Sequence, residues 1–176
     1  MAVFNVIEHV ELSSAVATWT SGTFATSYDH LFITMSARLD SGYNSAGYWR
    51  FNGDTGNNYS MTDLQSYNAS SVGTYYSASN DGIGFPPFSG SSSTANTFGS
   101  LKMWIPNYAN TSYFKPVLIT SGAESMTTTS SQYAVKRTAG LYRSTSAITS
   151  FNVHINGGHD FVQYSSYTVY GVTNDA

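Results

Sequence analysis

Residues 31–38, with the sequence LFITMSAR, give the clearest indication of the fold class of this chain. Its odd positions, Leu31, Ile33, Met35 and Ala37, are all apolar, and they alternate with Phe32, Thr34, Ser36 and Arg38. Successive side chains of an extended strand point to opposite faces, so this alternation predicts a β-strand with one buried face.

The same period of two recurs along most of the chain. The clearest further examples are Leu101–Ile105, Phe151–Ile155 and Tyr167–Tyr170. Less regular strands are predicted over Phe4–Leu12, Ala15–Thr20, Tyr48–Asn52, Gly73–Ser79, Tyr113–Thr120 and Ala134–Tyr142. No stretch has the spacing of a long amphipathic helix, and Ser60–Leu64 is predicted to hold at most one short turn. Turn signals such as Asn52-Gly53-Asp54 separate the strands, and the polar stretches Gly90–Asn96 and Ser125–Ser131 are predicted to be surface loops.

Residues 1–176 are therefore predicted to form one all-β domain. Short strands with regularly spaced turns are typical of an antiparallel β-sandwich, here a jelly-roll-like one with roughly eight to ten strands and little or no helix.

The low charge of the chain narrows its function. Charged residues make up 10% of the sequence, against about 25% in typical soluble domains. The surface must then consist largely of Ser, Thr, Asn, Gly and Tyr, which suits contact with protein or sugar. The net charge is −3 and the basic residues are scattered, so no nucleic-acid partner is expected.

The sequence also argues against a disulfide-bonded or thiolate-metal protein and against a membrane protein. There is no cysteine, and hence neither a disulfide nor a thiolate metal site. No segment approaches the roughly 20 apolar residues of a membrane span, so no membrane association is expected. The opening MAVFNVIEHVELSS does not read as a signal peptide.

Catalytic chemistry finds little support in the sequence. No Gly-x-Ser-x-Gly element is present. Asp54, Asp63 and Asp81 fall in or near predicted turns, where local capping explains them better than a glycosidase pair. No catalytic residue, and hence no enzyme activity, is predicted.

Two sets of side chains are weaker candidates for a metal. Asp54, Asn57 and Asn58 supply oxygen ligands that suit calcium, but they lack the acid count and spacing of an EF-hand. His154 and His159 flank a Gly-rich turn without a third ligand. We therefore predict no metal and no cofactor.

Aromatic side chains are the best candidates for a binding surface, since Tyr and Trp supply contact area at low entropic cost. Trp104 is the strongest, because it falls on the strand face opposite Met103 and Ile105. The predicted interface or binding residues are Trp104, Tyr108, Trp49, Tyr48, Tyr75 and Tyr76.

Three groups of segments resemble a known family. The first is YDHLFI at 28–33 with SAR at 36–38 and FNGDTGNNYS at 51–60. The second is IPNYAN at 105–110 with Lys115 shortly after, and the third is AITS at 147–150 with SYTVYGV at 166–172. In this order they resemble small phage virion structural proteins, whose members are similar to jelly-roll head decoration (cement) proteins and to fibre or tail domains.

The resemblance implies a non-enzymatic virion protein. We expect a capsid decoration protein that binds and stabilises the outer capsid, as a homotrimer, with the major capsid protein or other virion proteins as partners. It would be made in the host cytoplasm without a signal peptide and lie on the capsid surface or the tail. The alternatives are a receptor-binding tail-fibre tip that recognises host glycans, and a lectin-like carbohydrate-binding module.

Overall fold

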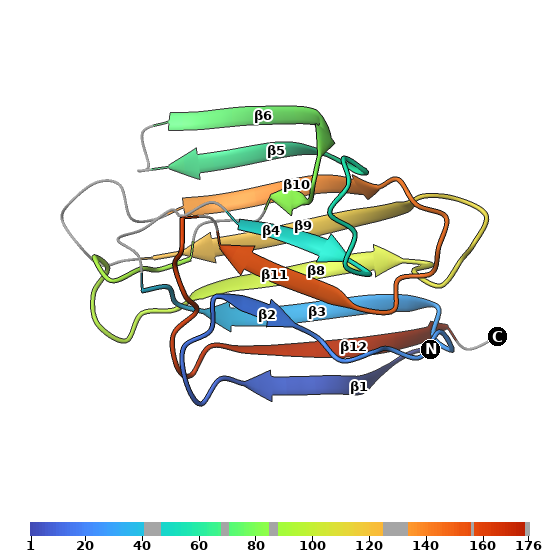
Figure 1. Cartoon of the computed structure of the whole chain (residues 1–176), viewed down its shortest axis with the longest axis horizontal. Helices are drawn as coiled ribbons and strands as arrows, with labels where there is room; N and C mark the ends of the chain where they lie inside the picture. The colour runs from blue at the N-terminus through green and yellow to red at the C-terminus, as the bar shows by residue number, and fades with distance from the viewer. Residues whose placement is uncertain (41–46, 68–70, 85–87, 125–133, 156, 175–176) are drawn as a thin grey trace.

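The described part of the chain is all β. The structure is a computed structural model that describes residues 1–40, 47–67, 71–84, 88–124, 134–155 and 157–174. These residues form twelve strands in two antiparallel sheets (Figure 1), which confirms the predicted all-β sandwich. Within those ranges there is no helix long and apolar enough to cross a membrane.

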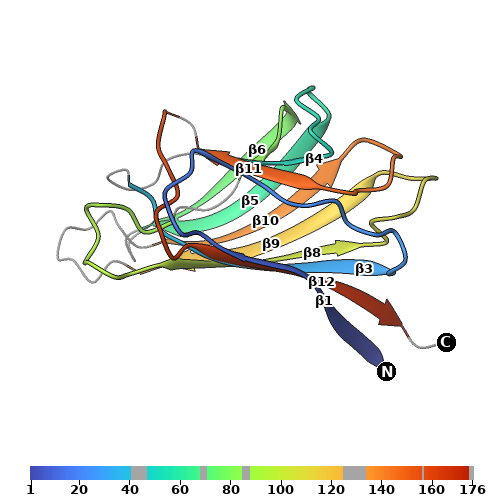
Figure 2. The same cartoon turned by 60° about the horizontal axis from the view of Figure 1, so that its bottom comes forward.

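The larger sheet has eight strands and the smaller has four. In spatial order, the larger sheet contains β1 (Ala2–Glu11), β12 (Ser166–Asn174), β3 (His30–Ala37), β8 (Gly99–Pro106), β9 (Lys115–Ala123), β10 (Ala134–Tyr142), β5 (Tyr59–Tyr67) and β6 (Ser71–Asn80). The smaller contains β2 (Thr18–Thr20), β11 (Phe151–Ile155), β4 (Gly47–Phe51) and β7 (Ile83–Gly84). Figure 2 shows the smaller sheet over one face of the larger. The strand order makes β1 and β6 the two edges of the larger sheet.

The core fills the space between the two sheets. Leu31, Ile33 and Met35 of β3 point into it, as their alternation predicts. Aromatic rings join the sheets: the ring centroid of Tyr167 on β12 lies 4.8 Å from that of Trp19 on β2 and 5.2 Å from that of Phe151 on β11. These contacts bury one face of each sheet, and no sheet or helix of the described residues covers the opposite face of the larger sheet.

The predicted turn at Ser60–Leu64 is wrong. These residues belong to β5, which pairs with β10 on one side and β6 on the other. The alternation was hidden because the inward position 63 is an aspartate, whose burial depends on a partner from another strand. Gly90–Asn96 contains turns, as predicted, although Gly90 and Ser93 are buried; Ser125–Ser131 lies outside the described residues.

The segments that carry the family resemblance contact one another. The Asn52 side chain donates to the carbonyl of Ala147 (2.8 Å) and accepts from the backbone N–H groups of Thr149 (2.8 Å) and Ser150 (3.3 Å). This bonding ties the turn after β4 to the segment before β11. Asn52 adopts a positive φ of 55°, and Gly53 one of 68°, as expected of a tight Asn-Gly turn.

The remaining resemblance segments meet near the start of β3. His30 Nδ1 accepts the backbone N–H of Asn107 at 3.0 Å. The ring of Tyr28 packs against Gly171, where an added Cβ would lie 2.3 Å from the Tyr28 Cγ. These contacts bring together residues that are far apart in the sequence.

Candidate interaction surface

Two of the predicted interface residues are buried, and that prediction is wrong. Trp49 and Tyr108 are both 0% exposed. The Trp49 ring packs against Phe151, with ring centroids 4.8 Å apart, and the Tyr108 hydroxyl donates to the carbonyl of Ala25. Burial raises the pKa of Tyr108 above its ordinary value. The alternation in β4 separates the two faces of the strand without showing which one is covered, so it could not place Trp49. Tyr108 lies in the turn after β8, where alternation gives no signal.

The other four aromatics reach the surface in separate places. Tyr48 is partly exposed and lies beside His154 on the smaller sheet. Trp104 is partly exposed on the uncovered face of the larger sheet. Tyr75 and Tyr76 are exposed on β6. The structure therefore does not gather the six predicted residues into one site.

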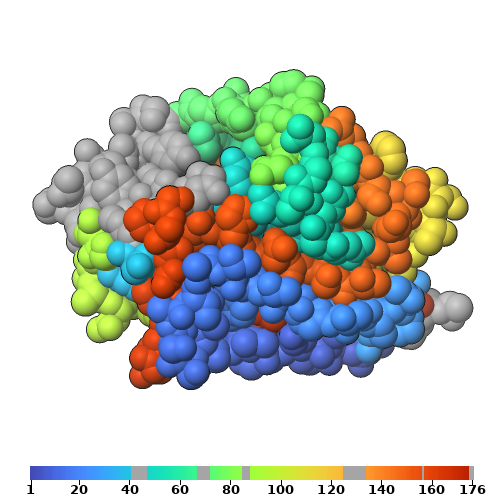
Figure 3. All heavy atoms as spheres, in the orientation of Figure 1, coloured from blue at the N-terminus to red at the C-terminus, as the bar shows by residue number. Residues whose placement is uncertain are grey.

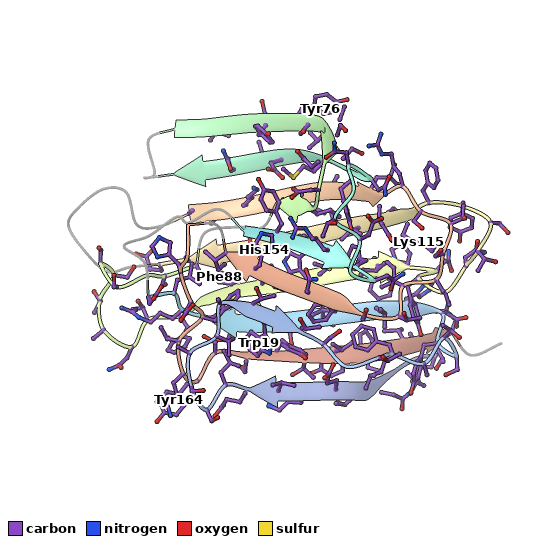
Figure 4. The ribbon with its side chains drawn as sticks, viewed as in Figure 1. Trp19, Tyr76, Phe88, Lys115, His154 and Tyr164 are labelled. Atoms are coloured by element: carbon purple, nitrogen blue, oxygen red, sulfur yellow. The ribbon has the colours of Figure 1, made fainter. Side chains whose placement is uncertain are left out.

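The β6 edge is the more open of the two edges of the larger sheet. Its sequence, SVGTYYSASN, contains no charged residue and no proline. Its pairing with β5 has one irregularity, between the pairs Asn80–Tyr59 and Ser77–Met61. Tyr76 is 69% exposed and lies at the outer margin of the sheet, and β6 forms one rim of the molecule (Figures 3 and 4). Long, uncharged edges are templates for another strand, and proteins normally block them with charges, prolines or bulges.

The opposite edge, β1, is protected over part of its length by charge and by an irregularity in its pairing. The pairing is irregular between Val6 and Glu8, and the strand carries two acids, Glu8 and Glu11. The N-terminal part of β1 is apolar and exposed at Val3 and Phe4. Both edges therefore present backbone for pairing, and β6 does so without any charge.

The uncovered face of the larger sheet, here called the outer face, is organised in rows that run across the strands. One row is apolar, and the strand register brings its members side by side. This aromatic row comprises Val6, Tyr170, Phe32, Trp104 and Leu118. The ring centroid of Trp104 lies 4.9 Å from that of His30, and the rings of Phe32 and Tyr170 lie 6.1 Å apart.

The neighbouring row on the outer face is polar and basic. This cationic row comprises Thr168, Thr34, Lys102, Thr120 and Arg137. A hollow of about 480 Å³ opens over it, and its lining includes Lys102, Thr34, Thr120 and Ser100. A smaller hollow of about 270 Å³ lies farther along the sheet and includes Arg137 in its lining.

Lys102 and Arg137 differ from the other basic residues of the chain. Five of the seven Lys and Arg residues are bonded within the fold. They are Arg38, Arg50, Lys115, Lys136 and Arg143. Lys102 and Arg137 are exposed, and the structure gives neither side chain a hydrogen bond or an ion pair with another described residue. Sequence reasoning missed this pair, because only the strand register brings the two residues onto one row.

The acids weighed for glycosidase chemistry are each bonded internally. Asp63 is 2% exposed and accepts from Lys136 at 2.7 Å, and Asp81 pairs with Arg50. Asp54 accepts from the backbone N–H of Gly56. Asp54 shows the local capping that the sequence favoured, but that interpretation is wrong for Asp63 and Asp81, whose partners are far along the chain.

The loop weighed for calcium bonds to itself. One Asp54 oxygen accepts from the Gly56 N–H (2.8 Å), and the other accepts from the Asn58 amide (2.9 Å). The Asn57 carbonyl accepts from Arg143. Among the described residues no group of three or more His, Cys, Asp or Glu side chains could hold a metal.

Two buried lysines were not anticipated from the sequence. Lys136 pairs with Asp63 on the inner face of the larger sheet. Lys115 is 0% exposed, and its ammonium donates to the carbonyls of Tyr113 (2.9 Å), Ser144 (3.3 Å) and Thr145 (3.2 Å) at one end of the sandwich (Figure 4). Burial lowers the pKa of Lys115. The Lys115 contacts join loops to β9, and Lys115 lines neither hollow described above, whereas Asp63 is among the residues that line the smaller one.

Comparison with known proteins assigns the chain to no family. No family model matches it, and no curated protein matches it. A solved structure of an alginate lyase is 14% identical, with 81% of this chain and 69% of that chain covered and a TM-score of 0.27. A similarity at that level carries no inference about this chain.

Proposed function

We propose that this chain is a non-enzymatic structural protein of a phage virion, with decoration of the outer capsid as its role. Two features support the proposal. The segments that resemble virion proteins are bonded to one another in the fold, as structural motifs are. The larger sheet has an open edge that one copy leaves unpaired.

The β6 edge is the observation on which the proposal chiefly rests. An uncharged ten-residue edge with exposed Tyr75 and Tyr76 favours pairing with another strand. Such pairing leads to aggregation of a free monomer, but it is useful in a protein that assembles. A second copy of this chain is the occupant that we propose. Main-chain hydrogen bonds would supply affinity, and the tyrosines would supply contact area with few rotatable bonds.

The two edges allow the expected homotrimer. If β6 of one copy pairs with the apolar part of β1 of the next, the contact joins unlike surfaces and closes a ring when the rotation allows. Such an assembly leaves the outer faces of the larger sheets free. Many copies bound to an assembled shell would then stabilise it by mass action.

Changing Tyr76 to lysine should weaken this assembly. A lysine on an edge strand opposes addition of another strand, and a loss of about 1.4 kcal/mol lowers an association constant tenfold. In sedimentation velocity at micromolar concentration we expect the unmodified chain to form oligomers and the Tyr76→Lys variant to be mainly monomeric.

Tyr113→Lys is the matched control, because Tyr113 is also exposed but lies in the loop before β9. It should leave the oligomer intact. Equal masses for the unmodified chain and the Tyr76→Lys variant would remove the β6 edge from the account.

A further inference from the structure

We propose that the outer face of the larger sheet binds an acidic polysaccharide, whose carboxylates are held by Lys102 and Arg137. This binding goes beyond the assembly proposed above, because it uses a face rather than an edge of the sheet. It assigns a ligand to the two basic residues whose side chains bond to no other described residue.

The positions of Lys102 and Arg137 are the first observation that supports this ligand. Lys102 pairs in register with Thr120, and Thr120 pairs with Arg137, so the two basic residues stand on one row two strands apart. Adjacent strands are about 4.8 Å apart, which puts the two backbone positions about 10 Å from each other. Two separated positive charges fit a ligand that carries spaced negative charges along its length.

The larger hollow, which lies beside Lys102, is the second supporting observation. Its described lining is rich in hydroxyls, including Thr34, Ser36, Ser100 and Thr120, and contains no Asp or Glu. Hydroxyl groups both donate and accept hydrogen bonds, as the hydroxyls of a sugar do. The hollow beside Lys102 is therefore electrostatically complementary to a carboxylated chain. Arg137 lines the smaller hollow, whose one acid, Asp63, is paired with Lys136, and the Thr120 hydroxyl stands between the two basic residues.

The aromatic row is the third supporting observation. Trp104 stands two residues from Lys102 on the same face of β8 and is partly exposed. Aromatic rings offer a flat apolar surface with little loss of side-chain freedom. A sugar that lies across the strands would place its polar edge over the hydroxyls and an apolar face against this row.

Nucleic acid fits the same face less well. Its affinity comes from many phosphate contacts made by clustered basic residues. The outer face offers two free cations, and the net charge of the chain is −3. The observations therefore favour a ligand of low charge density.

The test uses two carboxylated probes, polygalacturonate and hyaluronan oligosaccharides, with methyl-esterified polygalacturonate as the uncharged counterpart. Binding is followed by calorimetry and by tryptophan fluorescence. Trp19 and Trp49 are buried at 4% and 0% exposure, so Trp104 is the tryptophan positioned to report a ligand on this face. We expect at least one acid probe to bind and the ester to bind about tenfold more weakly, as loss of one charged hydrogen bond implies.

Variants then locate the site. Lys102→Gln and Arg137→Gln should each weaken binding of the acid probe about tenfold. Arg143→Gln removes the same charge elsewhere and should leave binding unchanged. Lys102→Gln should also keep the oligomeric mass, whereas Tyr76→Lys should keep the binding, so failure of assembly and failure of glycan binding are distinguishable.

Three results would overturn the inference. They are no binding to either acid probe, equal binding of the acid and ester forms, and unchanged binding by both the Lys102 and Arg137 variants. Tighter binding of an oligothymidylate than of either acid probe would also overturn it, since that result would assign the two cations to phosphates.

Discussion

Replacing Lys136 with methionine is expected to lower the free energy of unfolding by about 3–5 kcal/mol, because the change leaves a buried carboxylate without its cation. Asp63 is 2% exposed and lies 2.7 Å from the Lys136 ammonium. Its other carboxylate oxygen has no hydrogen-bond partner among the described residues. The lysine is therefore the group that makes burial of Asp63 tolerable.

Chemical denaturation measures this loss, and two further variants isolate its cause. Lys102→Met makes the same change on the exposed face of the same sheet and should alter stability by no more than about 0.5 kcal/mol. The double variant Asp63→Leu with Lys136→Met should recover most of the loss, since apolar pairs often replace buried ion pairs without cost. A Lys136→Met protein as stable as the unmodified one would show that the pair does not form.

Replacing Asn52 with alanine should cost about 2–4 kcal/mol, from several hydrogen bonds at about 1 kcal/mol each and a strained backbone. The Asn52 amide bonds Ala147, Thr149 and Ser150, and its φ is 55°. Alanine satisfies none of those groups and tolerates that φ poorly. Thermal or denaturant unfolding is the measurement.

Two controls separate the bonds from the backbone strain. Asn52→Gly tolerates the positive φ and should recover part of the loss. Asn96→Ala changes a residue with a similar φ of 66° whose side chain has no hydrogen bond to another described residue. It should cost only the backbone part, about 1 kcal/mol. If the Asn52 and Asn96 variants lose equal stability, the hydrogen bonds contribute nothing measurable.

The strands could be predicted from the sequence because period-two alternation is a local signal. The predicted strands Ala134–Tyr142 and Phe151–Ile155 have the bounds of β10 and β11. The strand at Tyr59–Tyr67 was missed because Asp63 interrupts its inner apolar face, and Lys136, which makes that burial tolerable, is far along the chain. β7 is only two residues long and leaves no periodic signal.

The candidate surfaces could not be predicted in the same way, since they depend on the order of the strands in the sheets. Tyr75 and Tyr76 were predicted to bind, but their place on an edge follows from the pairing of β6 with β5 alone. Trp49 was predicted wrongly because the covering sheet cannot be inferred from one strand, and Tyr108 because it lies in a turn without periodic signal. Lys102 and Arg137 are 35 positions apart in the sequence and meet on one row only through β9.

Electron cryo-microscopy of the particles made by the genome that encodes this chain would show whether the chain decorates a capsid. We expect many copies of this sandwich on the particle surface, each with β6 against a neighbouring copy and its tyrosines covered. Particles that lack the chain, or carry it with β6 open to solvent on every copy, would contradict this proposal.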